Sequence, residues 1–155
     1  MKQGKLTNEQ LNQIVLSHLH KRRSETAIGP AVGEDCAVMH WDADLLVMTT
    51  DPITAAAEGA GSLAVDVCCN DIASAGAEPV ALLLTLLVPP SAEVSDIEAI
   101  VCDAERAANA VGADIVGGHT EITDAVTRIV ISATAIGRAK KRVVSTSGMR
   151  SGDAI

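Results

Sequence analysis

The chain has 155 residues, of which 48% are hydrophobic and 21% are charged, and its mean hydropathy is +0.27. These values fit one packed domain and exclude a disordered chain. The net charge of −8 argues against a nucleic-acid or anionic-membrane surface, because phosphate contacts need clustered Lys and Arg. The four cysteines form no C-x-x-C pair, and no apolar signal core opens the chain, so we expect free thiols and a cytoplasmic protein.

The first predicted element is a helix from Thr7 to Arg23. Thr7 and Gln10 fit a capping box, and apolar residues follow at helical spacing. A loop rich in Gly and Pro, from Ile28 to Glu34, comes after this helix. Two short strands are predicted next, near Cys36–Met39 and Leu45–Thr50.

Helices and strands alternate in the rest of the chain. Ser62 to Ala77 is predicted as a helix, and the apolar run Val80–Val88 as a strand buried on both faces. Ser95 and Glu98 fit a second capping box, which opens an amphipathic helix that ends near Gly112. Three further β segments are expected: Ala113–Val116 leading into a turn at Gly117-Gly118, a long strand over Thr127 to Ile136, and a strand or hairpin from Val143 onward.

This order predicts an α/β (α+β) fold, with a single mixed β-sheet and helices packed on one face. We expect residues 1–28 to form an N-terminal helix and arm, and residues 29–155 to form one domain. The last six residues have the pattern of a strand that is beginning, so a second, C-terminal domain absent from this chain is expected to follow Ile155.

Four acidic motifs fall at the predicted ends of strands and helices. Two carboxylates about 4 Å apart repel by about 4 kcal/mol at an effective dielectric near 20, so a fold that gathers these acids would favour a cation among them. Carboxylate oxygens suit Mg²⁺, which keeps several of its waters. The sequence therefore predicts a magnesium–nucleotide site, built from Gly33-Glu34-Asp35-Cys36, Thr49-Thr50-Asp51-Pro52, Asn70-Asp71 and Gly117-Gly118-His119-Thr120-Glu121.

These motifs, and above all the block from Asn70 to Pro79, resemble the amino-terminal domain of the aminoimidazole ribonucleotide (AIR) synthase, or PurM-like, superfamily. The resemblance covers about Gly29 to Gly137 and is greatest for the HypE-like, AIR-synthase-related branch. It implies an ATP-binding domain that forms a homodimer by pairing its sheet with its partner's into a β-barrel, with ATP and Mg²⁺ near the interface. It also implies phosphoryl transfer to an oxygen or selenium of a small-molecule or protein-bound acceptor, as in hydrogenase maturation by HypE. The isolated domain is expected to be inactive.

The resemblance also suggests the roles of individual residues. Asp35, Asp51 and Asp71 match metal-coordinating acids of the superfamily. Its members carry an acid directly after the two glycines, where this chain has His119, so Glu121 is expected to be the fourth metal-binding carboxylate. Nucleotide contacts are expected from Asn70, Gly117, Gly118, His119 and Thr120, and no catalytic residue is assigned.

Each motif also has a structural interpretation. Asp35 can be a turn acid, Asp71 can serve a structural hydrogen bond, and Gly117-Gly118 can be an ordinary turn. The segment from Gly59 to Ser62 can bind an anion at a helix start or simply begin the helix. For the whole chain, the alternatives are a thiamine-monophosphate kinase-like enzyme and a non-catalytic dimerisation module.

Overall fold

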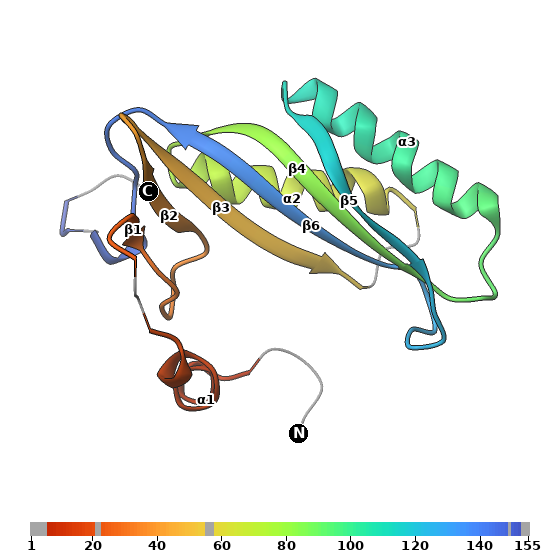
Figure 1. Cartoon of the computed structure of the whole chain (residues 1–155), viewed down its shortest axis with the longest axis horizontal. Coiled ribbons are helices and arrows are strands. Elements are labelled where there is room, and N and C mark those ends of the chain that lie inside the picture. Colours follow the sequence, from red (N-terminus) through yellow and green to blue (C-terminus); the bar gives the residue numbers. More distant parts are fainter. Residues whose placement is uncertain (1–5, 21–22, 55–57, 149, 153–155) are drawn as a thin grey trace.

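One mixed sheet organises the chain in the computed structural model, which describes residues 6–20, 23–54, 58–148 and 150–152 (Figure 1). Its strand order is β1-β2-β3-β6-β4-β5. All neighbours are antiparallel except β4 and β5, which are parallel. The strands are β1 (Thr26–Ile28), β2 (Ala37–Trp41), β3 (Asp44–Ile53), β4 (Glu78–Val88), β5 (Asp114–Ile122) and β6 (Val130–Ala139).

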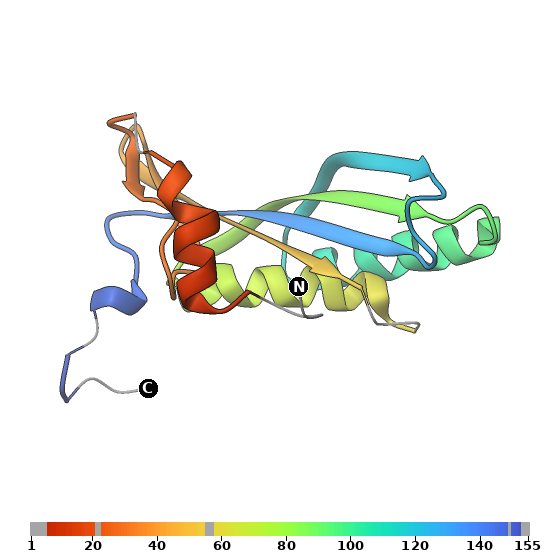
Figure 2. The same ribbon diagram turned by 90° about the horizontal axis from the view of Figure 1, so that it is seen from below.

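Helices α2 (Ala60–Ser74) and α3 (Val94–Ala110) cover one face of this sheet (Figure 2). The expected fold class, a single mixed sheet with helices on one face, is therefore confirmed. Strand β6 lies between β3 and β4 and is antiparallel to both, so β3, β4 and β5 all point the same way. The carboxyl ends of these three strands therefore lie at the same end of the sheet. No helix among the described residues is long and apolar enough to cross a membrane.

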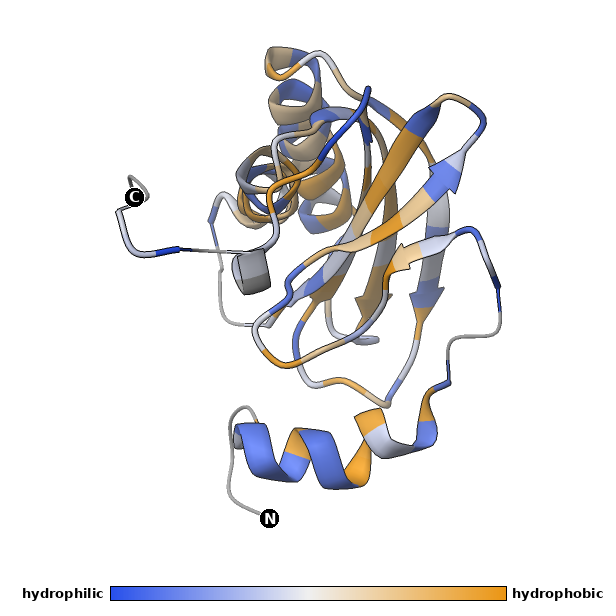
Figure 3. Cartoon of the chain, turned by 90° about the vertical axis from the view of Figure 1, so that its left-hand side faces the viewer, coloured by the Kyte–Doolittle hydropathy of each residue, from blue (hydrophilic) through white to orange (hydrophobic). Residues whose placement is uncertain are grey.

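The core lies between the sheet and the two helices and consists of small and aliphatic side chains, as the near absence of aromatic residues requires. Figure 3 shows how hydrophobic residues concentrate along the strands, whereas the N-terminal helix α1 (Asn8–Ile14) is mostly hydrophilic. Every second residue is buried along β6 and in β3 as far as Thr49, which is the period expected of strands that pack on one face.

Strand β4 differs from the prediction that it is buried on both faces. Leu82, Leu84 and Leu86 are buried beneath the helices, but Leu83 between them is 39% exposed. The prediction was wrong for the single chain because no described element covers the second face. That face nevertheless presents aliphatic side chains from neighbouring strands, and we call it the open face; it includes Leu46, Met48, Leu83, Leu87 and Ile136.

The N-terminal helix is shorter than predicted. Thr7 and Gln10 do form the capping box, but α1 ends at Ile14 and a 3₁₀ turn follows at Leu16–His18. The helix has no buried residue, so little tertiary packing extends it beyond its local signals. The short strand β1, at the predicted loop boundary, was not anticipated.

Two other boundaries also shift. Helix α3 begins at Val94 because the Glu93 backbone N–H donates to Asp96 Oδ2 at 2.9 Å, so the predicted capping box at Ser95 was wrong by two positions. Gly112 follows the helix with a positive φ of 72°, close to the predicted end. No strand or hairpin is present from residue 143 onward among the described residues; a 3₁₀ turn lies at Thr146–Gly148 instead.

The two helices that cover the sheet meet at Gly61, in the first turn of α2. A Cβ atom there would lie 2.1 Å from the backbone oxygen of Ile100 and 2.8 Å from the backbone nitrogen of Ala104. Gly61→Ala must therefore push α2 away from α3, and we expect it to lower the free energy of unfolding by about 2 kcal/mol. Urea unfolding measures this loss. Gly148→Ala, which meets nothing within 4 Å, is the control and should change stability little; equal stability of both variants would contradict this helix packing.

Candidate functional site

Three of the predicted site acids come from different elements. Asp51 lies near the carboxyl end of β3, Asp71 in the last turn of α2, and Asp35 in the loop before β2. Thr49 connects two of them. Its hydroxyl donates to Asp71 Oδ2 at 2.9 Å and lies 3.2 Å from the backbone oxygen of Asp35. Because successive side chains of β3 point to opposite faces of the sheet, Thr49 and Asp51 share the face beneath the helices.

The thiol of Cys36 lies among these carboxylates. Burial raises the pKa of Cys36 to about 11, and the negative charges of Asp71, Asp35 and Asp51 contribute in that order. The pKa of Cys68, on α2, also rises to about 11, mainly through burial, with further increases from Asp51 and Asp71. Asp51 and Asp71 thus raise the pKa of both thiols, whereas Asp35 contributes at Cys36.

Asp35, Asp51 and Asp71 fit a site for magnesium together with a nucleotide better than a site in which the protein alone holds the metal. Within the described ranges, no three His, Cys, Asp or Glu side chains are close enough to hold a metal ion by themselves. Mg²⁺ does not require such a cage, because it is usually bound through one or two carboxylates together with substrate phosphates and water. The oxygen donors of Asp35, Asp51 and Asp71 are of the type that Mg²⁺ prefers.

The fourth predicted carboxylate lies elsewhere. Asp51 pairs with Ala133, Ala133 with Leu84, and Leu84 with Gly118, so β5 is three strands away from Asp51. Three strand spacings correspond to roughly 14 Å. Glu121 lies three residues further along β5, where it pairs with Leu87 of the open face. One chain therefore does not bring Glu121 to the other three acids.

His119 and Glu121 form their own pair on β5. The distance between His119 Nε2 and Glu121 Oε2 is 3.5 Å, and both side chains are more than half exposed. His119 pairs with Thr85 in the parallel β4–β5 ladder, so it shares the open face with Glu121. Thr120 lies between them and pairs with Leu86 on the helix side. Asn70 is exposed on α2, directly before Asp71.

Gly117 and Gly118 lie within β5 and not in a turn, which corrects the structural interpretation of this pair as well as the predicted end of the strand at Val116. A Cβ on Gly118 would be 1.8 Å from the backbone oxygen of Leu84, so only glycine allows β5 to run this close to β4. A small cavity of about 290 Å³ opens beside this stretch, between β5 and α3, and Gly117, Gly118, His119 and Thr120 are among its lining residues.

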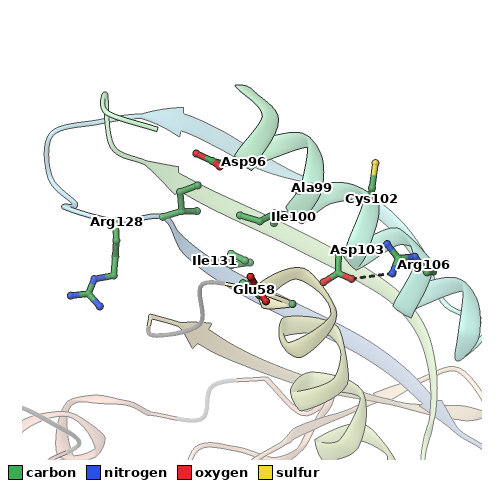
Figure 4. Close-up of a pocket in the computed structure, with 12 residues that line it drawn as sticks. Glu58, Asp96, Ala99, Ile100, Cys102, Asp103, Arg106, Arg128 and Ile131 are labelled. Atoms are coloured by element: carbon green, nitrogen blue, oxygen red, sulfur yellow. Dashed lines mark hydrogen bonds and ion pairs between the residues drawn. The ribbon is translucent and has the colours of Figure 1, made fainter. Parts of the chain in front are cut away.

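A larger cavity of about 760 Å³ lies between the start of α2, α3 and the start of β6 (Figure 4). Its floor is apolar, with Ile100, Ile129 and Ile131, and its rim carries both acids and arginines. Asp103 occupies the N-terminus of α2, because the Ser62 backbone N–H donates to its carboxylate at 2.8 Å. This bond lowers the pKa of Asp103. The segment from Gly59 to Ser62 is thus a helix start capped by a protein carboxylate, which disfavours anion binding there.

Sequence reasoning named Thr49 only as part of the Asp51 motif, with no role of its own, and did not single out Ser145 or Thr146. Thr49 is buried, and its place two residues before Asp51 on an alternating strand was the available signal. Ser145 donates to Glu34 Oε1 and Thr146 donates to the backbone oxygen of Gly33, both at 2.6 Å. These contacts join residues more than 110 positions apart, and no local pattern indicates them.

Comparison with known proteins identifies the family of this chain. The sequence profile described as "AIR synthase related protein, N-terminal domain" matches residues 33–139, which include all of the predicted site residues. A Methanocaldococcus jannaschii protein, named for hydrogenase expression/formation, is 30% identical over 98% of this chain and 47% of its own length. Thiamine-monophosphate kinase of Aquifex aeolicus is 26% identical over 95% of this chain and 48% of its own length. The chain thus spans about half the length of these curated relatives.

Solved structures show the same fold. A structure of AaThiL complexed with AMPPCP and TMP superposes with a TM-score of 0.69 at 27% identity, covering 76% of this chain and 40% of that one. The HypE–HypF complex contains a chain with a TM-score of 0.67 at 30% identity and the same two coverages, 76% and 40%.

Proposed function

Because the chain belongs to the AIR synthase related protein family, whose N-terminal domain it matches over residues 33–139, we propose a function of the HypE type. In this proposal the chain is the Mg-ATP-binding, dimerising domain of an ATP-dependent phosphoryl-transfer enzyme. Residues 29–155 form this domain in our proposal, and residues 1–28 form its arm. The acceptor would be a small molecule or a group on a protein. The acceptor-binding part of the enzyme would lie outside the residues described.

The observation that supports the proposal is the Thr49 hydroxyl, which contacts the Asp71 carboxylate and the Asp35 backbone oxygen, with Asp51 on the same face of β3. Three carboxylates that share one region repel one another and attract a divalent cation. In the proposal these acids hold Mg²⁺, which would offset the charge of a bound triphosphate. The AaThiL structure, a complex with AMPPCP and TMP, supports the proposal because that protein contains a domain of this fold.

The proposed homodimer accounts for two features that one chain leaves unexplained. The open face of the sheet carries aliphatic side chains that no described element covers. Glu121 and His119 lie on that face, three strands from the other acids. If Glu121 belongs to the metal site, it must therefore come from a second copy. Pairing of two open faces would bury the apolar residues and bring His119 and Glu121 of each copy to the interface.

Calorimetric titration with AMPPCP, with and without Mg²⁺, tests the nucleotide site. We expect measurable binding in the presence of Mg²⁺ and at least about tenfold weaker binding in EDTA, because without the cation the phosphates face only protein carboxylates. Binding that is the same in both conditions would contradict the proposal, and so would the absence of binding.

A thiamine-monophosphate kinase-like activity is the second candidate, favoured by the likeness to the Aquifex aeolicus kinase and to AaThiL. His119 stands where an acid follows the two glycines in both kinase-type and HypE-type members, so this position does not decide between the two candidates. Titration with thiamine monophosphate separates the two candidates. A purely non-catalytic dimerisation module is distinguished by sizing chromatography of the same sample, because it would form dimers that no nucleotide affects.

A further inference from the structure

The loop that carries Asp35 has little secondary structure to hold it. Residues 33–36 lie between a turn and the start of β2, and within the loop the Glu34 backbone N–H donates to Ala31 at 3.3 Å. Tertiary contacts supply further support. Thr49 lies 3.2 Å from the Asp35 backbone oxygen, and the Cys36 thiol donates to the backbone oxygen of Asp71 at 3.4 Å. The position of Asp35 therefore depends on side chains from other parts of the fold.

The segment from Val143 to Thr146 approaches this loop from the other end of the sequence. Val143 packs against the core, and the Val144 backbone N–H donates to Ala75 at the end of α2, at 2.9 Å. The next two residues then donate to the loop, Ser145 to the Glu34 carboxylate and Thr146 to the Gly33 backbone oxygen, both at 2.6 Å. We call residues 143–146 the strap.

The strap joins two of the three acidic elements. One of its ends is bonded next to the helix terminus that carries Asp71, and the other is bonded to the two residues before Asp35. A hydrogen bond to a charged group is stronger than one between neutral groups, so the Ser145–Glu34 contact is the firmer of the two. Gly33 has a φ of 85°, which places the Thr146 contact at the bend of the loop.

We propose that Ser145 and Thr146 are positioning residues that hold the Asp35 loop against α2, so that Asp35 and Asp71 keep a fixed separation before any cation binds. This proposal rests on the proposed function only for the reason why the Asp35 loop is held. The hydrogen bonds that hold the loop are a property of the ligand-free chain. Without the strap, the loop opens more often, and Cys36, which is half-buried, becomes more accessible while the rest of the core stays closed.

The test is the rate at which iodoacetamide labels each cysteine of the ligand-free protein, resolved by peptide mass spectrometry. The double variant Ser145→Ala with Thr146→Val should label Cys36 roughly tenfold faster, since two hydroxyl hydrogen bonds are lost. Cys68 and Cys69, which are buried, and Cys102, which is already exposed, should keep their rates. Replacing Thr146 by Ser in the Ser145→Ala background restores one hydroxyl and should return part of the protection.

Two matched controls remove hydroxyls far from the loop. Ser24→Ala deletes a serine bond to the Glu25 carboxylate, and Thr123→Val deletes a threonine contact with the Ala125 backbone N–H. Neither should change the labelling of Cys36. An unchanged Cys36 rate in the double variant overturns the proposal, as does an equal rise at Cys68 and Cys69, because the strap would then support the whole domain. Failure of Mg-ATP binding in the parent protein would refute the proposed function and leave this labelling result intact.

Discussion

Gly118→Ala is expected to lower the free energy of unfolding by about 3 kcal/mol or more, as overpacking against a backbone that cannot yield does. The added methyl group would lie 1.8 Å from the Leu84 backbone oxygen, 2.6 Å from its carbon and 2.8 Å from its nitrogen. These atoms belong to β4, which is bonded on its other side to β6, so relief requires β5 to leave the sheet. The φ of 150° at Gly118 adds a backbone cost for any other residue.

Gly117→Ala is the matched control, since it adds the same methyl group one residue earlier in the same strand. Its Cβ would meet only the end of the Leu83 side chain, at 3.4 Å, which is ordinary van der Waals contact. Urea unfolding of both variants gives the difference directly, and amide hydrogen exchange shows whether β5 alone is lost. Equal stability of the two variants would contradict the close approach of β5 to β4.

The same glycine shows where sequence patterns stop being informative. A Gly-Gly pair after a short apolar run is typical of a turn, and the local sequence contains nothing against that interpretation. The reason for Gly118 is the backbone of Leu84, a neighbour in the sheet that is 34 positions away in the numbering. By contrast, the amphipathic spacing of α3 is a local signal, and that helix was predicted within two residues at either end.

Strand β4 gives a second example. Its apolar residues on both faces predicted burial on both faces, and only the helix side is covered in one chain. Both faces of the strand are apolar, but what covers the second face cannot be deduced from β4 itself. We propose that a second copy supplies it, and the fold class did not depend on that point.

The candidate site was likewise predicted from the sequence only in part. Acids at strand and helix ends indicated a shared region, and in the structure the Thr49 hydroxyl contacts both the Asp71 carboxylate and the Asp35 backbone oxygen. The carboxyl ends of β3 and β5 do lie at the same end of the sheet. Strands β6 and β4 lie between them, however, and separate Glu121 from Asp51. Strand order depends on long-range pairing, and sequence alone did not supply it.

Asp71→Asn is expected to weaken Mg-dependent binding of AMPPCP about 100-fold, which corresponds to about 2.7 kcal/mol. Asparagine keeps an oxygen that can accept the hydrogen bond from the Thr49 hydroxyl, now 2.9 Å from Asp71 Oδ2, so the fold should be retained. What is lost is one anionic oxygen donor in a site that we propose offers three carboxylates to the cation. The thermal stability of the variant without ligand should accordingly stay close to that of the parent.

Asp66→Asn is the control that separates coordination from net charge. Asp66 is exposed on the same helix, five positions before Asp71, and its substitution changes the charge of the protein by the same amount. Calorimetry at constant ionic strength should show near-parental affinity for this variant, because exposed charges are screened within about 10 Å at 0.1 M salt. If Asp66→Asn and Asp71→Asn weaken binding equally, the acids act only through a diffuse field. If neither weakens it, the nucleotide binds away from the region around Cys36, and the assignment of Asp71 to the magnesium site is wrong.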